Sequence, residues 1–207
     1  MNVASGDRVS RLVEGVEVLR RLWSEERVTH HGRFYSFTDL EALPKPVQQS
    51  VPILIAANPK EQSLDDPVVD RILRRIATHG DGWQTDATPV ETFRQRFARI
   101  REYAESQGRD SSKLDSCLHL MVNINDDRTQ GLKEAQQFLQ AYYGAGAVSQ
   151  EKADLWLACG SPDEVIEKIQ EYVDAGCTTP VLRFVSPDLK GQLRRCIEDV
   201  LPAFSSS

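Results

Sequence analysis

The chain has 207 residues, which is enough for one domain with a substantial core. Its composition, 40% hydrophobic and 27% charged, is that of a folded, water-soluble protein rather than a disordered or fibrous one. The net charge of -6 argues against nucleic acid as a partner, because phosphate backbones are bound by clustered Lys and Arg. No membrane-length apolar run or signal-peptide core is found, so we expect a cytoplasmic protein with no membrane partner.

The predicted elements alternate along the chain between helices and apolar strands. Apolar residues at helical spacing predict a first helix over residues 10–24, which would bury Leu12, Val16, Leu19 and Trp23. Apolar runs at residues 51–57, 83–85, 117–124 and 180–185 predict strands of a parallel sheet covered on both faces. Further helices are predicted over residues 127–143 and, as a short one, over 151–158.

Four more helices are predicted where a capping side chain precedes proline, and the last of them would bury Leu189, Leu193, Ile197 and Val200. The four pairs are Asp66-Pro67, Thr88-Pro89, Ser161-Pro162 and Ser186-Pro187. Glu91 and Glu164 would complete capping boxes with Thr88 and Ser161. Helices are expected to end in left-handed glycines at Gly80, Gly108 and Gly176.

This alternation predicts an α/β fold, either a barrel or an open doubly wound sheet. About four strands are found, which is half of what a closed (β/α)₈ barrel needs.

Several short motifs, taken in order, resemble the luciferase-like family of flavin- or deazaflavin-dependent oxidoreductases. They are VTHHGRFY from Val28, PILIAA from Pro52, GDGW from Gly80 and GSPDEV from Gly160. The resemblance implies a partial TIM (β/α)₈ barrel formed by the C-terminal half of the family's fold. Residues 1–207 would then be a single luciferase-like domain, N-terminally truncated relative to the family. The implied cofactor is FMN or coenzyme F420, bound at the C-terminal ends of the strands.

The resemblance also suggests where cofactor-binding residues lie. After the strand that begins at Ile53, Ala56, Ala57 and Asn58 would let the backbone approach the cofactor, although small residues also suit ordinary strand packing. Lys60 is a candidate for a phosphate on charge alone.

The motif Gly80-Asp81-Gly82-Trp83 has two interpretations: it contacts the cofactor, or it is a helix stop followed by a core tryptophan. In either case Gln84 and Thr85 would reach the barrel mouth.

Arg183 interrupts an apolar strand. It would either point into the barrel and meet an anionic cofactor or substrate, or form a buried ion pair. His119, alone in its strand, is expected to be a core residue.

The four cysteines are widely spaced, so each is expected to be a buried apolar side chain, and no metal site is expected. No residue is assigned a catalytic role. The first functional hypothesis, which the resemblance implies, is a flavin- or deazaflavin-dependent oxidoreductase or monooxygenase acting on a small-molecule substrate, with the cofactor carrying the chemistry. The alternative is a non-catalytic half-barrel that works only as a homo-oligomer, such as a dimer, or with a partner that supplies the missing half-barrel.

Overall fold

The computed structural model describes residues 4–61 and 63–204. After a short 3₁₀ turn at Ser5–Asp7, the first part of the chain forms α1 (Arg8–Ser24) and the strands β1 (Val28–His31), β2 (Ser36–Leu40) and β3 (Leu54–Ala56). The middle forms α2 (Pro67–His79), β4 (Gly82–Asp86), α3 (Val90–Ser106), a 3₁₀ turn (Ser111–Lys113) and β5 (Asp115–Ile124). No helix among the described residues has the length and apolar character needed to cross a membrane.

The last part of the chain contains one strand that the sequence did not predict. It forms α4 (Arg128–Tyr143), α5 (Gln150–Trp156), β6 (Leu157–Gly160), α6 (Pro162–Asp174), β7 (Thr179–Phe184) and α7 (Leu189–Arg195). A π-helical turn, Cys196–Val200, and a 3₁₀ turn, Leu201–Phe204, follow directly. The unpredicted strand is β6, and its first two residues, Leu157 and Ala158, were assigned to the end of a helix.

The main sheet is parallel and has the strand order β3-β4-β5-β7. The strand β6 pairs with the last four residues of β5, on the edge of β5 that β4 leaves free beyond Asp86. A helix follows each of the strands β3, β4, β5, β6 and β7. This arrangement confirms the predicted half of a (β/α)₈ barrel.

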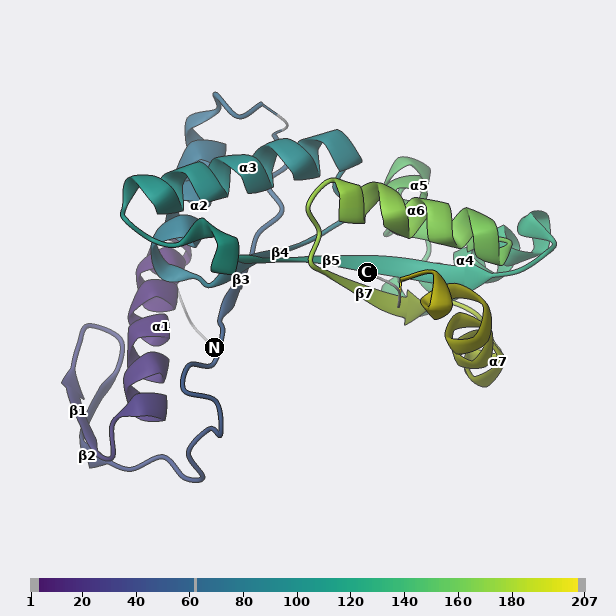
Figure 1. Ribbon diagram of the computed structural model, residues 1–207. Coiled ribbons are helices and arrows are strands. Elements are labelled where there is room, and N and C mark those ends of the chain that lie inside the picture. The colour runs from purple at the N-terminus through teal and green to yellow at the C-terminus, as the bar shows by residue number, and fades with distance from the viewer. Residues whose placement is uncertain (1–3, 62, 205–207) are drawn as a thin grey trace.

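The hydrophobic core lies between the sheet and the helices α2, α3 and α6, of which α3 and α6 run along one face of the sheet in Figure 1. The Trp83 ring stacks on Phe93 with centroids 5.0 Å apart, and Tyr172 meets Phe93 edge-on at 5.9 Å. In β5, Leu118, Leu120 and Val122 belong to this core, so the alternate residues point to the opposite face of the sheet.

A hairpin of β1 and β2 lies beside α1, at the end of the molecule away from α7 (Figure 1). The Glu14 carboxylate of α1 accepts hydrogen bonds from the backbone N–H groups of Phe34 and Tyr35, at 3.0 and 2.8 Å. The helix is tied to the sheet by Arg20, which forms an ion pair with Asp81 at 2.7 Å.

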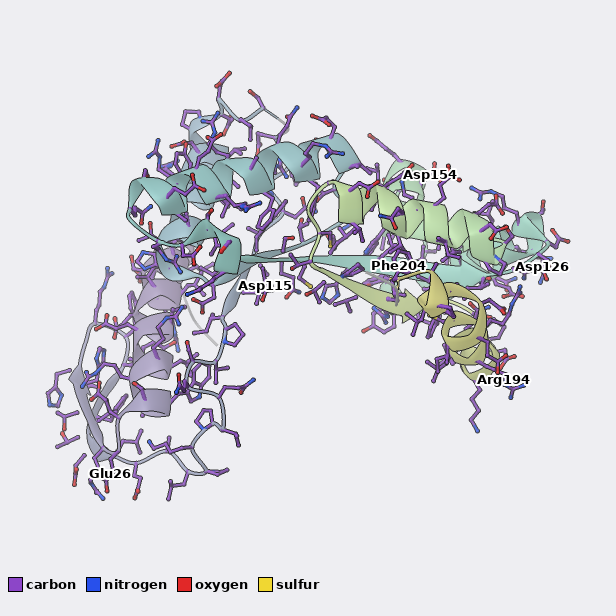
Figure 2. The ribbon with its side chains drawn as sticks, viewed as in Figure 1. Glu26, Asp115, Asp126, Asp154, Arg194 and Phe204 are labelled. Carbon is purple, nitrogen blue, oxygen red and sulfur yellow. The ribbon has the colours of Figure 1, made fainter. Side chains whose placement is uncertain are left out.

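Two predicted buried faces are exposed. Leu189, Leu193 and Ile197 are 53%, 51% and 53% exposed, and of the predicted set only Val200 is buried. In α1, Leu12 and Leu19 are both 41% exposed, whereas Val16 is buried as predicted and Trp23 is half-buried. The prediction was wrong because no described element covers these faces; Figure 2 shows Arg194 of α7 projecting away from the rest of the molecule.

The cap predictions held at two helices and failed at two. Asp66 accepts from Val68 and Val69 N–H, and Ser161 and Glu164 form the predicted capping box. Thr88 does not cap α3, because its hydroxyl bonds to Asp86 O and Thr85 Oγ1. Ser186 donates to Glu134 instead, and α7 is capped by Asp188.

Two of the three predicted glycine helix ends are also correct. Gly108 and Gly176 have φ of +73° and +99°, whereas Gly80 has φ of -93° and is extended.

Candidate functional site

A pocket of about 540 Å³ opens at the carboxyl ends of β3, β4 and β7 and over the middle of β5, on the face of the sheet opposite the main core. Parallel strands end at the same edge of a sheet, and barrel proteins place their sites there. The lining residues come from all four strands, the loop after β3, and α4 and α5: Ala56, Ala57, Asn58, Gln84, Thr85, Asp86, His119, Leu120, Met121, Tyr143, Lys152, Trp156 and Arg183.

The strand register explains why residues distant in sequence meet here. Ala56 is paired with Gln84, and Met121 with Arg183, in adjacent strands. Gln84 reaches across to His119, with 3.0 Å between Gln84 Nε2 and His119 Nε2. The His119 side chain thus faces the pocket and not the core, where it was predicted. In the pocket it can exchange hydrogen bonds with a ligand.

One wall of the pocket is made by small residues. Ala56 is exposed and Ala57 is half-buried, so a flat ligand can approach the backbone at the end of β3. Asn58 follows them and donates from Nδ2 to both the backbone oxygen and Oδ1 of Asp86, each at 2.7 Å. These bonds tie the end of β3 to the end of β4.

Arg183 supplies positive charge on the opposite wall. Its Nη1 donates to Tyr143 Oη at 3.1 Å, and the guanidinium lies 4.2 Å from the centre of the Tyr142 ring and 5.4 Å from that of Phe138. No ion pair of Arg183 is found in the described part of the chain, so the predicted buried ion pair is not formed. Aromatic rings contact the guanidinium instead.

The helix α5 closes a further side of the pocket with residues that the sequence analysis did not select. Trp156 Nε1 donates to His119 O at 3.0 Å, and Lys152 Nζ lies 4.6 Å from the centre of the Trp156 ring. The same Nζ is 3.8 Å from Asp86 Oδ2. A pair of cations, Lys152 and Arg183, therefore lines the pocket.

The remaining predicted site residues lie elsewhere. The motif of residues 80–83 lies at the amino end of β4 or in the core. A Cβ on Gly82 would lie 2.4 Å from Asp115 O. Asp81 contacts Arg109 at 3.5 Å as well as Arg20. Trp83 is fully buried and reaches the pocket only by donating to Ala57 O at 2.8 Å. Lys60 is exposed on the loop beyond Asn58 and is not a lining residue. Gln84 and Thr85 line the mouth, as predicted.

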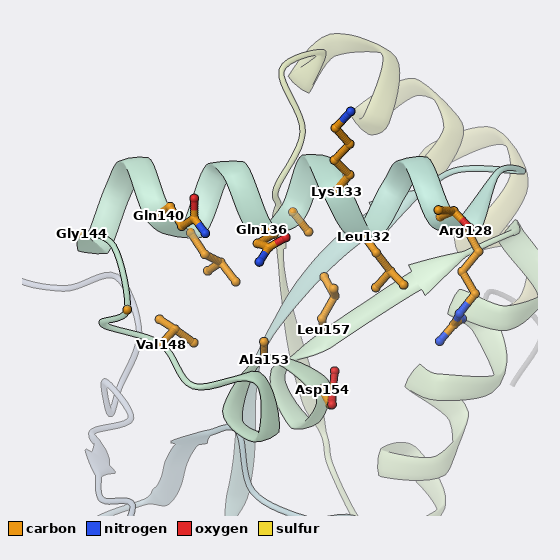
Figure 3. A pocket seen from close by; sticks show the side chains of 14 residues that line it. Arg128, Leu132, Lys133, Gln136, Gln140, Gly144, Val148, Ala153, Asp154 and Leu157 are labelled. Atoms are coloured by element: carbon orange, nitrogen blue, oxygen red, sulfur yellow. The ribbon is translucent and has the colours of Figure 1, made fainter.

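A second cavity, of about 630 Å³, lies between α4 and α5 (Figure 3). Leu132 and Gln136 of α4 face Ala153 and Asp154 of α5 across it. Because Lys152 and Trp156 line the first pocket, α5 separates the two cavities.

The cysteines are buried thiols, as predicted. Burial raises the pKa of both Cys159 and Cys177 to about 11. Both thiols are therefore protonated at neutral pH and poorly suited to nucleophilic chemistry.

A parallel strand array with helices after its strands, and a pocket where three of the strands end, is the architecture of a partial α/β barrel. The family model described as luciferase-like monooxygenase matches residues 1–179, and the chain belongs to that family.

Curated relatives of the chain include F420-dependent glucose-6-phosphate dehydrogenases. The protein from Kineococcus radiotolerans is 27% identical, over 95% of this chain and 60% of its own length. The one from Segniliparus rotundus is 28% identical, over 82% of this chain and 53% of its own. The chain thus spans roughly 53–60% of the length of these two relatives.

Solved structures resemble the fold at low identity. An F420-dependent secondary alcohol dehydrogenase, solved with an F420-acetone adduct, superposes with a TM-score of 0.78 at 19% identity, over 97% of this chain and 63% of its own. The monooxygenase RslO1 from Streptomyces bottropensis gives 0.73 at 24% identity, over 98% of this chain and 64% of its own.

Proposed function

We propose that the chain carries part of the site of an F420- or FMN-dependent oxidoreductase acting on a small anionic substrate. The observation that supports this most strongly is the pocket at the carboxyl ends of β3, β4 and β7, which combines a wall of small residues with two cations. Family membership supports the oxidoreductase class, and the curated relatives named above favour F420 over FMN.

The residues present fit a flat, anionic cofactor. Ala56 and Ala57 leave room for a ring beside the end of β3, whereas larger side chains would fill it. Trp156 and Tyr143 provide aromatic surface, and Asn58 lies where a polar tail would leave the pocket. A bound F420 or FMN would supply hydride transfer.

The chain's own residues would bind and orient the substrate. Arg183 is oriented by Tyr142 and Tyr143, and its guanidinium can receive a carboxylate or phosphate. Lys152 adds a second charge from α5. His119, hydrogen-bonded through Nε2 to Gln84, would donate or accept a proton at Nδ1.

The test is the affinity of the purified chain for F420 and for FMN, measured by calorimetry, in the wild type and in Ala56→Leu. We expect saturable binding of one cofactor, and a loss of about tenfold or more in the variant, because a leucine fills the wall. Leu12→Ser, on the exposed face of α1, is the control and should bind as the wild type does. Equal affinity in Ala56→Leu would refute this placement of the cofactor.

A second candidate function is a half-barrel that acts through assembly with a second copy or with a partner that supplies further strands. The exposed apolar residues of α7 and the turns that follow it, Leu189, Leu193, Ile197 and Leu201, form one continuous stripe at i, i+4 spacing, and this stripe favours the idea. Burial of such an apolar stripe against a second protein surface would stabilise the complex through the hydrophobic effect.

A further inference from the structure

Three oxidisable rings connect the pocket with the surface of the chain. Trp156, the last residue of α5, lines the pocket and is 7% exposed. The centre of the Tyr143 ring lies 5.8 Å from that of Trp156, and the centre of the Tyr142 ring lies 4.7 Å from that of Tyr143. Exposure rises along this series, to 38% at Tyr143 and 61% at Tyr142. Rings at these separations are in contact, so an electron can pass directly from one to the next.

The hydrogen bonds treat the two ends of this series differently. Trp156 Nε1 donates to His119 O at 3.0 Å, and a backbone carbonyl is too weak a base to remove that proton. Tyr143 Oη accepts from Arg183 Nη1 at 3.1 Å, which leaves its own hydroxyl hydrogen to be donated elsewhere. An oxidised indole therefore keeps its positive charge here, whereas an oxidised tyrosine at the exposed end releases its proton to water and becomes neutral.

Two cations oppose a positive charge that stays on the rings. Lys152 Nζ lies 4.6 Å from the centre of the Trp156 ring, and the Arg183 guanidinium lies 4.2 Å from that of Tyr142. Like charges at these distances repel, and Asp86, 3.8 Å from Lys152 Nζ, offsets only part of the repulsion at the indole. A tyrosine escapes this repulsion by losing its proton. The arrangement thus favours movement of an electron from the tyrosines to an oxidised Trp156.

We propose that Trp156, Tyr143 and Tyr142 form a one-electron relay from the pocket to the surface. A one-electron oxidant in the pocket takes an electron from Trp156, which regains one from Tyr143, which regains one from Tyr142. The O–H bond of Tyr142 then breaks and its proton goes to water. The net change is one electron gained by the oxidant, and one electron and one proton lost by Tyr142. That the oxidant is a flavin excited by light rests on the proposed function, whereas the relay among the side chains does not.

The relay is tested in the chain without ligand by pulse radiolysis with the azide radical, which oxidises indole faster than phenol near neutral pH. The starting variant is Trp23→Phe; Trp83 is fully buried, so Trp156 is then the indole that azide reaches from the pocket. We expect the indolyl absorption to decay as phenoxyl absorption grows, at a rate independent of protein concentration. Adding Tyr143→Phe should abolish this growth, because the ring remains but is no longer oxidised under these conditions.

The matched control adds Tyr103→Phe instead, since Tyr103 lies between α2 and α3 and bonds to Asp70. This variant should show the same growth of phenoxyl absorption as Trp23→Phe alone. No growth in Trp23→Phe, or growth that is equally fast after addition of Tyr143→Phe, would overturn the relay.

Entry of the electron vacancy from the pocket is tested by flash excitation of the chain saturated with FMN. We expect phenoxyl absorption in the wild type, its loss in Trp156→Phe and its retention in Trp23→Phe, each at a saturating concentration determined by titration. An equal phenoxyl yield in Trp156→Phe would overturn entry through this residue. If the wild type does not bind FMN, the proposed function fails for this cofactor and the entry step fails with it, and the azide experiment still decides the relay.

Discussion

Among single residues, Arg183 contributes most to the proposed substrate site. We predict that Arg183→Met lowers the affinity for an anionic substrate by about tenfold or more, because a charge-assisted hydrogen bond is worth about 1.5–3 kcal/mol. Tyr143→Phe, which removes only the bond that orients Arg183, should have a smaller effect. Calorimetry measures both, with Arg194→Met on exposed α7 as the control. A loss in the control as large as that in Arg183→Met would contradict the assignment.

The two most perturbed thiols predict how stability depends on alkaline pH. The pKa values of Cys159 and Cys177 are raised to about 11 by burial, against about 8.5 for a thiol in an unfolded chain. The folded state holds these protons more tightly, so their contribution is complete below pH about 8.5 and is lost as the pH rises toward 11. Urea unfolding between pH 8 and 10 should show a decrease on the order of 1 kcal/mol per thiol. The decrease should be smaller in Cys177→Ala, and an unchanged slope in that variant would contradict the prediction.

At the scale of elements, the contact of α4 with β5 and β6 depends on Gly131. A Cβ there would lie 2.8 Å from Cys159 Sγ and 3.0 Å from Asn125 Cβ. We predict that Gly131→Ala lowers the free energy of unfolding by about 1–3 kcal/mol, since the helix must move outward. Gly6→Ala, where a Cβ meets nothing within 4 Å, is the control in the same chemical denaturation experiment. Stability equal to that of the wild type would show that the helix can shift without cost.

The capping box of α6 provides a second prediction at this scale. Ser161→Ala removes the acceptor for the Glu164 N–H and should cost about 1 kcal/mol of stability. Thr88→Ala should act differently, since its hydroxyl belongs to a buried network with Thr85 and Asp86 rather than to a cap. A thermal melt of each variant measures the two losses. A melting temperature unchanged in Ser161→Ala would contradict the role of the cap.

These helix starts illustrate what sequence could predict. Local rules placed Asp66 and Ser161 correctly, because nothing competes for those side chains. They failed at Thr88, whose hydroxyl bonds to Thr85 at the end of the preceding strand. They also failed at Ser186, whose hydroxyl bonds to Glu134, which is distant in sequence. The strand β6 was missed because it follows α5 directly. The helix ends at Trp156 and the strand begins at Leu157, and no glycine or proline marks the boundary. For the same reason Lys152 and Trp156 were not predicted at the pocket, whereas Ala57 and Arg183 stand at strand ends that the apolar pattern marks.

At the scale of the whole molecule, the apolar stripe on α7 and the turns after it should control association. We predict that Leu193→Gln combined with Ile197→Gln lowers the molar mass or the aggregation measured by light scattering, because 51% and 53% of these side chains is exposed. Leu132→Gln, on α4 and 39% exposed, is the matched control and should leave the mass unchanged. A monomeric wild type at high concentration would remove the rationale for assembly with a second copy.

Tryptophan fluorescence measures directly whether the pocket at the strand ends binds a flavin or deazaflavin, as we propose. Trp156 lines this pocket, while Trp23 lies beside Arg20 at a separate depression and Trp83 is in the core. Titration with F420 or FMN should quench the wild type saturably. The quench should be much reduced in Trp156→Phe and retained in Trp23→Phe. Saturable quenching that survives in Trp156→Phe, or no saturable quenching of the wild type by either cofactor, would contradict the account.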